Sequence, residues 1–383
     1  MQGTRVIMKF VLAPDSFKES MTAREAALAM ERGIKKIFPD SICTLVPMAD
    51  GGEGTVQSLI DAMDGQLVTA QVTDPLGRKI EASYGYIHEK NTAVIEIASA
   101  SGIHLLKKEE RNPLKTTSFG TGELIKDALN KGATRFIIGL GGSVTNDGGK
   151  GMLHALGARF LNEKGEELPP GGGALQELHH IDLSMLDKRL DHVHFDIASD
   201  VTNPLVGKEG ASYIFGPQKG ATEEMVLQLD AALSHYASII KELIGKDVTN
   251  AAGAGAAGGL GAAFLAFFNS TMQRGVDIVL QLTEFETKLQ DADFVFTGEG
   301  SIDGQTVFGK TPIGVSKVAQ AYNIPVIGFA GKVEKEAANL YEHGFLAIVG
   351  ILMGITDIET ALKNGPENLE RATENVCRIL KGR

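Results

Sequence analysis

The chain has 383 residues, about twice the usual length of one domain, and its 43% hydrophobic and 22% charged residues are typical of a globular enzyme. The formal net charge of −11 argues against nucleic acid and anionic membrane surfaces as partners, because both attract an excess of Lys and Arg. Two cysteines cannot form a disulfide framework, and the sequence shows no signal-peptide pattern and no membrane-spanning run, so we expect a cytoplasmic protein.

Strands and helices alternate at both ends of the chain. In the first part the expected strands are 9–13, 42–47 and 66–73, and the expected helices are 22–38 and 55–63. In the last part the expected strands are 293–298, 325–331 and 345–352, and helices begin at Pro312, at 334–343 and at 366–382. This alternation predicts right-handed crossovers and a parallel sheet.

The middle of the chain has a different pattern. Residues 79–98 read as a hairpin, followed by a helix at 122–131, strands at 135–140 and 193–198, and a helix at 223–244. We therefore predict an α/β protein of two domains. An open Rossmann/flavodoxin-like parallel sheet domain comprises residues 1–72 plus 286–383, and an inserted mixed α/β domain comprises 73–285.

The stretch "DGQTVFGKTPIGV" (303–315) has the G-x-x-x-x-G-K-[ST] spacing of a P-loop. A P-loop requires its first glycine directly after a buried strand. The expected strand ends near Thr297, and bulky Val307 and Phe308 occupy positions where the backbone should be open to phosphate. We interpret the match as coincidental, although Lys310 remains a candidate phosphate ligand.

A second glycine motif, "GAGAAG" (253–258), has the spacing of a dinucleotide-binding fingerprint but lacks the hydrophobic strand that should precede it. We interpret it as the start of a small-residue helix that packs tightly against a neighbour. Two alternatives stay open at this stage: an NAD(P)-dependent oxidoreductase acting on a small hydroxy acid, and a non-catalytic two-lobed ligand-binding module.

The third motif, "GLGGSVTNDGGKG" (139–151), follows an expected strand directly and is rich in backbone donors, as an anion cradle requires. Asp147 within it is a candidate metal ligand. The candidate phosphate- or cofactor-binding residues here are Gly141, Gly142, Ser143, Thr145 and Asn146.

Three further loops follow expected strands, and ligands of open α/β sheets bind at the carboxyl ends of the strands. The segment "ADGGEGT" (49–55) offers backbone donors and carboxylates, "APDSFKES" (13–20) offers Lys18, and "TGEGSIDGQT" (297–306) adds further carboxylates. We expect these loops to share one face. The residues concerned in "ADGGEGT" are Asp50, Gly51, Gly52, Glu53 and Gly54.

These segments resemble the type I glycerate kinase family, in the family's order and over essentially the whole chain from Met8. Further matching segments are "DPLG", "SFGTGELI", "SDVTNPL" and "FGPQKGA". The resemblance implies transfer of the ATP γ-phosphoryl group to D-glycerate, with Mg²⁺, at an active site in the cleft between two domains. It leaves open which hydroxyl is phosphorylated and whether the chain forms a homodimer.

Residue roles follow from what phosphoryl transfer requires. Lys18 and Lys310 are expected to neutralise phosphate charge, and Asp200, which follows the strand at 193–198, is expected to accept the hydroxyl proton. The expected metal-shell carboxylates are Asp50, Asp147, Glu299 and Asp303.

Overall fold

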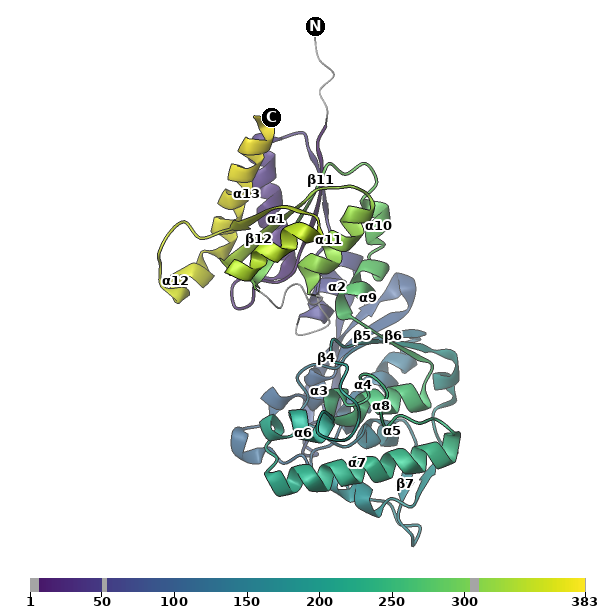
Figure 1. The fold of residues 1–383 in the computed structure, drawn as a ribbon. Coiled ribbons are helices and arrows are strands. Elements are labelled where there is room, and N and C mark those ends of the chain that lie inside the picture. Colours follow the sequence, from purple (N-terminus) through teal and green to yellow (C-terminus); the bar gives the residue numbers. More distant parts are fainter. Residues whose placement is uncertain (1–6, 50–53, 304–309, 383) are drawn as a thin grey trace. The chain divides into compact units, whose positions relative to one another are not determined.

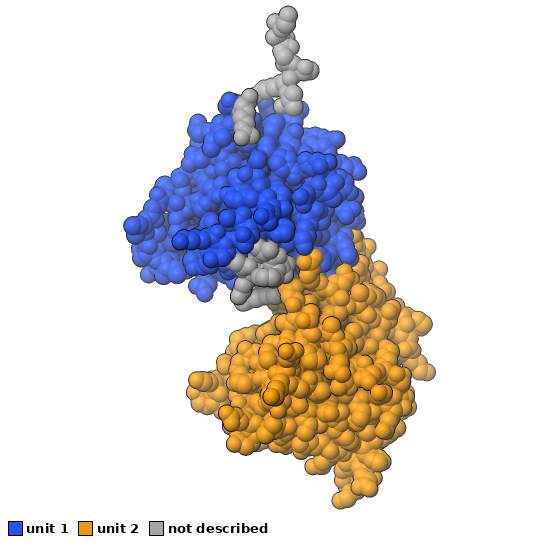
Figure 2. All heavy atoms as spheres, in the orientation of Figure 1, with its two compact units in different colours: residues 1–50, 57–64, 276–383 blue, residues 51–56, 65–275 orange. Residues whose placement is uncertain are grey.

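The computed structural model describes residues 7–49, 54–303 and 310–382. The chain divides into two compact units (Figure 2): unit 1 comprises residues 1–50, 57–64 and 276–383, and unit 2 comprises residues 51–56 and 65–275. Within the described ranges, no helix has the length and apolar character needed to cross a membrane. The domain boundaries expected near residues 73 and 285 remain a prediction.

Unit 1 contains a five-stranded sheet in the order β13-β12-β11-β1-β2, and every pairing in it is parallel. Strands from both ends of the chain therefore form one sheet, with β1 and β11 as neighbours. The strands are β1 (Lys9–Pro14), β2 (Ile42–Leu45), β11 (Phe294–Ile302), β12 (Val326–Val333) and β13 (Phe345–Gly350).

Helix α1 shows how local sequence fixes the elements of unit 1. The Thr22 hydroxyl and the Glu25 carboxylate form the expected capping box at its first turn. Gly33 on α1 lets this helix approach α13 closely (Figure 1), because a Cβ there would lie 2.4 Å from the Glu370 carbonyl oxygen. The helices that belong wholly or partly to unit 1 are α1 (Ala23–Ile37), α2 (Thr55–Met63), α9 (Gly275–Leu282), α10 (Phe285–Lys288), α11 (Thr311–Ala321), α12 (Ile358–Lys363), α13 (Gly365–Lys381) and the 3₁₀ helix η8 (Lys335–His343).

Unit 2 contains a six-stranded mixed sheet in the order β10-β9-β6-β5-β4-β3. Its four strands from β5 to β10 are parallel, and β3 and β4 add to them in antiparallel pairing. The strands are β3 (Gln66–Thr73), β4 (Lys79–Ile87), β5 (Thr92–Glu96), β6 (Arg135–Gly139), β9 (His194–Ala198) and β10 (Ser270–Gln273), and β7 (Arg159–Leu161) pairs separately with β8 (His180–Asp182).

Each unit has its own aromatic core. Phe10 contacts Phe296 in unit 1 with ring centroids 5.3 Å apart, and Phe136 stacks on Phe195 in unit 2 at 4.8 Å. The helices of unit 2 are α3 (Ala98–Ser101), α4 (Phe119–Asn130), α5 (Lys150–Ala155), α6 (Ala211–Phe215), α7 (Glu223–Ile244) and α8 (Ala256–Phe267), with the 3₁₀ helices η1 (His88–Lys90), η2 (Ile103–Leu105), η3 (Lys108–Glu110), η4 (Gly173–Glu177), η5 (Lys188–His192) and η6 (Pro217–Lys219).

The α/β architecture, the hairpin of β4 and β5 and helix α7 are confirmed. One expectation was wrong: residues 66–73 are not a third strand of the parallel sheet of unit 1. They form β3, which pairs antiparallel with β4 along its whole length, from Gln66 opposite Tyr86 to Thr73 opposite Lys79. The alternation of strands and helices in the sequence does not show which sheet β3 joins, because its hydrogen-bond partners on another strand decide this.

Candidate functional site

The loop after β1 lies beside the end of β11 in unit 1. Pro14 pairs with Gly298, and the Asp15 amide donates to the Gly298 carbonyl oxygen at 2.8 Å. The Asp15 carboxylate accepts hydrogen bonds from the Ser16 amide at 2.6 Å and from the Thr311 hydroxyl at 2.5 Å. The loop after the first strand is therefore tied to the first residue of α11.

Strand β11 brings two carboxylates and a lysine together. It continues to Ile302, so Glu299 lies within the strand and Asp303 directly follows its last residue. Lys310, the N-cap residue of α11, places its Nζ 4.0 Å from Glu299 Oε2 and 3.6 Å from Asp303 Oδ1. The structure brings these three residues together, and the roles expected for them remain proposals.

Lys18 lies in the loop after β1 and is exposed. Gly300 on β11 faces its backbone, since a Cβ on Gly300 would lie 3.5 Å from the Lys18 nitrogen. We name Lys18, Glu299, Asp303 and Lys310 the β11 cluster. Glu299, Asp303 and Lys310 form a charged group at the carboxyl end of β11, and the backbone of Lys18 lies beside Gly300 of the same strand.

The strand end near Thr297 was predicted wrongly. Residues 299–302 continue the pairing with β12, from Glu299 opposite Ala330 to Ile302 opposite Val333, so the strand ends two residues before Gly304. One of the two arguments against a P-loop is thereby lost. The other argument concerns Val307 and Phe308, which lie with the rest of 304–309 outside the described residues.

The carboxyl ends of three parallel strands meet at one edge of the unit 2 sheet. Glu96 at the end of β5 pairs with Gly139 at the end of β6, which pairs with Ala198 at the end of β9. The loop after β6 carries the glycine-rich motif, and exposed Asp200 follows β9 by two residues. This edge, which we name the unit 2 edge, therefore brings the glycine-rich loop (residues 140–149) close to Asp200.

The segment "ADGGEGT" lies only partly within the described residues. Asp50, Gly51, Gly52 and Glu53 lie outside them, whereas Gly54 is described and has a φ of +92°. At the start of α2, the Val56 amide donates to Glu96 Oε1 at 2.9 Å. The Val56 amide is therefore already hydrogen-bonded to a carboxylate of the protein and is not available to a phosphate.

The buried carboxylate of Asp147 anchors the glycine-rich loop. It is 0% exposed and accepts hydrogen bonds from the Ser118 amide and hydroxyl at 2.8 and 2.9 Å, from the Gly149 amide at 3.1 Å and from the Gly151 amide at 3.2 Å. Both carboxylate oxygens are thus used within the protein. This geometry favours a structural role for Asp147 over the metal-binding role expected from the sequence.

Lys219 supports the same loop from η6 and is fully buried. Its Nζ donates to Ser143 Oγ at 2.9 Å and to the Thr145 carbonyl oxygen at 2.7 Å. Burial lowers the pKa of Lys219 to about 7, while the negative charge of Asp147 opposes this shift. Sequence reasoning noted "FGPQKGA" without assigning this lysine a role, because nothing local indicates that its side chain is buried.

Only the start of the glycine-rich loop reaches solvent. Gly141 and Gly142 are exposed, whereas Ser143, Thr145 and Asn146 are buried. Of the expected phosphate ligands in this loop, the two glycines are therefore the accessible ones. Thr145 Oγ1 and Asn146 Oδ1 have no hydrogen-bond partner among the described residues, so a ligand or water would lower the cost of burying them.

The motif "GAGAAG" covers the glycine-rich loop. Residues 257–259 have positive φ values at the start of α8, and the Gly148 amide donates to the Gly258 carbonyl oxygen at 3.0 Å. A Cβ on Gly258 would lie 2.1 Å from the Thr145 carbonyl oxygen. The interpretation as a tightly packed small-residue helix is confirmed, and no strand precedes the motif in the described residues 246–255.

No group of three or more His, Cys, Asp and Glu side chains in the described part of the chain is arranged to hold a metal ion. Mg²⁺, however, is commonly bound through one or two carboxylates together with substrate phosphates and water. Glu299 and Asp303 are two carboxylates of this kind, and in the structure the Lys310 ammonium lies near both of them, at 4.0 and 3.6 Å. A role in holding Mg²⁺ with a nucleotide phosphate is a proposal.

Two residues of unit 1 were missed by sequence reasoning. Asp15 directly follows β1, a position that by itself marks a candidate site residue. Thr311 is the final residue of the P-loop spacing, and its hydroxyl contacts Asp15. The P-loop spacing could have drawn attention to Thr311, but it was interpreted as coincidental.

The close packing of α8 predicts the effect of Gly258→Ala. The new methyl group would clash with the Thr145 carbonyl, in addition to the cost of a φ of +68°. Gly245→Ala is the matched control, because Gly245 has a φ of +71° and a Cβ added there would have no atom within 4 Å. We expect Gly258→Ala to lower the free energy of unfolding by at least about 1 kcal/mol more than the control. Equal shifts in the thermal unfolding midpoint would contradict close packing.

Buried Lys219 predicts a pH-dependent contribution to stability. Its pKa falls from the ordinary lysine value of 10.5 to about 7 in the fold, so the unfolded chain binds more protons between these pH values. The contribution of Lys219 to the free energy of unfolding therefore rises with pH across that window, by at most about 1.4 kcal/mol per pH unit. The stability of the wild type relative to Lys219→Met should rise between pH 7 and pH 10.5 in thermal unfolding. The same comparison with Lys131→Met, at an exposed lysine, should be flat; a flat Lys219→Met comparison would exclude the lowered pKa.

Comparison with known proteins agrees with this geometry. Residues 10–381 match the glycerate kinase family. The chain is 51% identical to the glycerate kinase of Bacillus subtilis (strain 168) over 98% of both chains, and 50% identical to the glycerate 2-kinase of Escherichia coli (strain K12) over 97% of this chain and 98% of that one.

A crystal structure from Salmonella typhimurium LT2, provisionally described as glycerate kinase 2, superposes with a TM-score of 0.92. It is 50% identical in sequence, and the match covers 98% of this chain and 99% of that one. Both the sequence match and the structural match therefore extend over both units and include the β11 cluster and the glycine-rich loop. The chain belongs to the glycerate kinase family.

Proposed function

We propose that this chain catalyses ATP-dependent phosphorylation of D-glycerate at the 2-hydroxyl group, with Mg²⁺ as cofactor. The observation that carries the proposal is the near full-length identity of about half to the Escherichia coli relative, whose name specifies the 2-kinase reaction. The family relationship favours a kinase over the oxidoreductase and the non-catalytic binding module.

The β11 cluster supports a role in binding the phosphates of ATP. Bound Mg²⁺ would neutralise charge on the phosphate oxygens, and Glu299 and Asp303 are the residues that would hold it. Lys310 lies near both carboxylates, and the backbone of Lys18, in the loop after β1, lies beside Gly300 of β11. In this proposal both lysines stabilise negative charge on the transferred phosphoryl group.

The unit 2 edge supports a role in binding and activating the acceptor. The exposed backbone of Gly141 and Gly142 would donate hydrogen bonds to the glycerate carboxylate or to phosphate. Asp200 is exposed at the end of β9 and would accept the proton of the attacking hydroxyl group. We assign Asp147 and Lys219 to holding this loop in place, because both are buried and hydrogen-bonded within unit 2.

The activity is tested by measuring ADP release with D-glycerate, with L-glycerate and without an acceptor. We expect release that depends on D-glycerate and on Mg²⁺. The ³¹P NMR spectrum of the product identifies the hydroxyl group, because phosphorus on the 2-oxygen couples to one proton and phosphorus on the 3-oxygen couples to two. A phosphorus triplet would contradict the 2-hydroxyl assignment, and nicotinamide reduction without ADP release would contradict the kinase.

Asp200→Asn tests the proposed base. The amide keeps the shape of the side chain but is a far weaker proton acceptor, so kcat should fall by about 10²- to 10⁴-fold while the KM for ATP changes little. Asp191→Asn is the matched control, because Asp191 is an exposed aspartate of η5 in the same unit. Near-normal turnover of Asp200→Asn would remove Asp200 from this role.

Lys310→Ala tests the phosphate contact at the β11 cluster. Loss of one charged hydrogen-bond donor should weaken nucleotide binding by about tenfold without abolishing it. Lys317→Ala, at an exposed lysine of α11, should leave binding unchanged. Binding is measured with a fluorescent ADP analogue. Complete loss of binding in Lys310→Ala would instead indicate a P-loop lysine.

A further inference from the structure

Unit 2 contains a cavity that the proposed function does not use. It has a volume of about 270 Å³ and lies between the first turn of α4, helix α5 and the segment that follows β7. None of the residues to which the proposed function assigns a role lines it. Its size is just below the usual range of roughly 300–1,000 Å³ for ligand pockets, which indicates a small occupant.

One buried cation lines this cavity. Lys150, the first residue of α5, is 3% exposed, and its Nζ donates to the Pro169 carbonyl oxygen at 2.5 Å. An ammonium group has three N–H donors, and this bond uses one of them. Burial lowers the pKa of Lys150 to about 8, while the charge of Asp147 opposes this shift, so the group is mainly protonated at pH 7.

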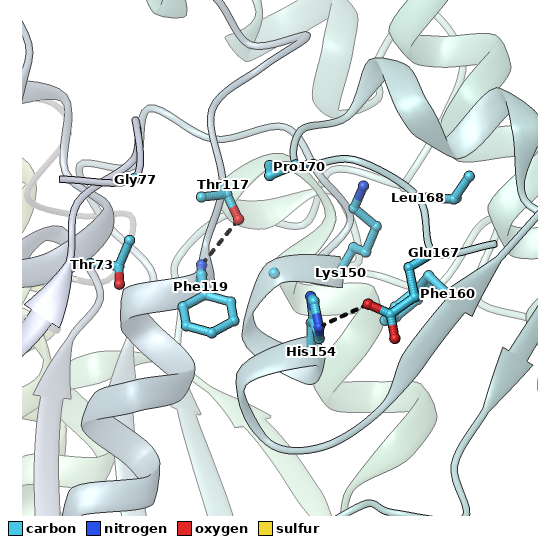
Figure 3. Close-up of a pocket in the computed structure, with 11 residues that line it drawn as sticks. Thr73, Gly77, Thr117, Phe119, Lys150, His154, Phe160, Glu167, Leu168 and Pro170 are labelled. Atoms are coloured by element: carbon cyan, nitrogen blue, oxygen red, sulfur yellow. Dashed lines mark hydrogen bonds and ion pairs between the residues drawn. The ribbon is translucent and has the colours of Figure 1, made fainter.

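The Glu167 carboxylate is a second charged group at the cavity, and it is paired. One Glu167 carboxylate oxygen lies 3.7 Å from His154 Nε2 (Figure 3). The other accepts a hydrogen bond from Arg159 Nε at 2.7 Å. The hydrogen bond from Arg159 lowers the pKa of Glu167 and holds it in the ionised form. Glu167 thus has its own cationic partner, and the Lys150 ammonium has two N–H donors that the Pro169 carbonyl does not use.

The remaining walls are largely apolar and aromatic. The rings of Phe119 and His154 lie side by side in Figure 3, edge to face, with centroids 5.6 Å apart. Phe160 and Leu168 are buried and close the other side. The Thr117 hydroxyl accepts the Phe119 amide at 3.3 Å, and its own proton remains able to donate to an occupant.

We propose that this cavity binds a small carboxylate with an apolar body, and that the Lys150 ammonium and the Thr117 hydroxyl bind the carboxylate group. The aromatic and aliphatic walls receive the apolar part of the ligand. Inorganic phosphate is a poorer fit, because it would leave these walls without an apolar partner. Glycerate is also a poorer fit, because its two hydroxyl groups would face apolar side chains.

Benzoate and its neutral isostere benzamide are the probes, measured by isothermal titration calorimetry on the full chain at pH 7. We expect saturable benzoate binding at one site per chain, with benzamide and phosphate at least about tenfold weaker, because benzamide lacks the negative charge and phosphate lacks the apolar body. Equal affinity for benzoate and benzamide, or no saturable benzoate binding, would overturn the proposal.

Variants locate the site. Lys150→Met keeps the length of the side chain and removes the charge, so benzoate binding should be lost. Lys131→Met, at an exposed lysine, should bind benzoate as the wild type does. Leu168→Trp fills the cavity without changing Lys150 and should also abolish binding, with an unchanged circular dichroism spectrum as evidence of folding. Benzoate binding that persists in both Lys150→Met and Leu168→Trp would place the ligand elsewhere and overturn the proposal.

Discussion

The buried carboxylate of Asp147 is the interaction on which the order of unit 2 depends. Its four hydrogen bonds join the start of α4, the glycine-rich loop and the start of α5. A buried carboxylate is stable only when donors surround it, so these three segments have to keep their positions together. The same contacts connect the glycine-rich loop to the walls of the Lys150 cavity, because Gly151 lines it and Ser118 lies between two residues that line it.

The polar groups of the two units are held in different ways. In unit 1, charged side chains stand at the ends of parallel strands, and Lys310 lies between Glu299 and Asp303. In unit 2, the charges of Asp147 and Lys219 are buried and bind the glycine-rich loop, of which Gly141 and Gly142 are exposed. The first arrangement suits a metal–phosphate complex, and the second suits an anion bound by the backbone.

Most of the fold could be predicted from the sequence, because amphipathic helices and buried strands have local signatures. The capping box at Thr22 and the hairpin of β4 and β5 are examples. The assignment of β3 to the parallel sheet failed, since strand pairing is non-local. The predicted end of β11 was wrong because Gly298 and Gly300 resemble a loop in sequence. In the structure they continue the strand beside Phe17 and Lys18.

By itself the sequence determined the α/β class, the family resemblance and the residues that stand at the strand ends, because motif spacing and periodicity are properties of the chain. Only the tertiary structure decided which of those residues are accessible. Asp147, Thr145 and Asn146 look like ligands in "GLGGSVTNDGGKG", but α8 and Lys219 bury them. Burial depends on segments more than 70 residues away, as the 74-residue separation between Lys219 and Thr145 shows. A local sequence pattern cannot predict a contact between segments so far apart in the chain.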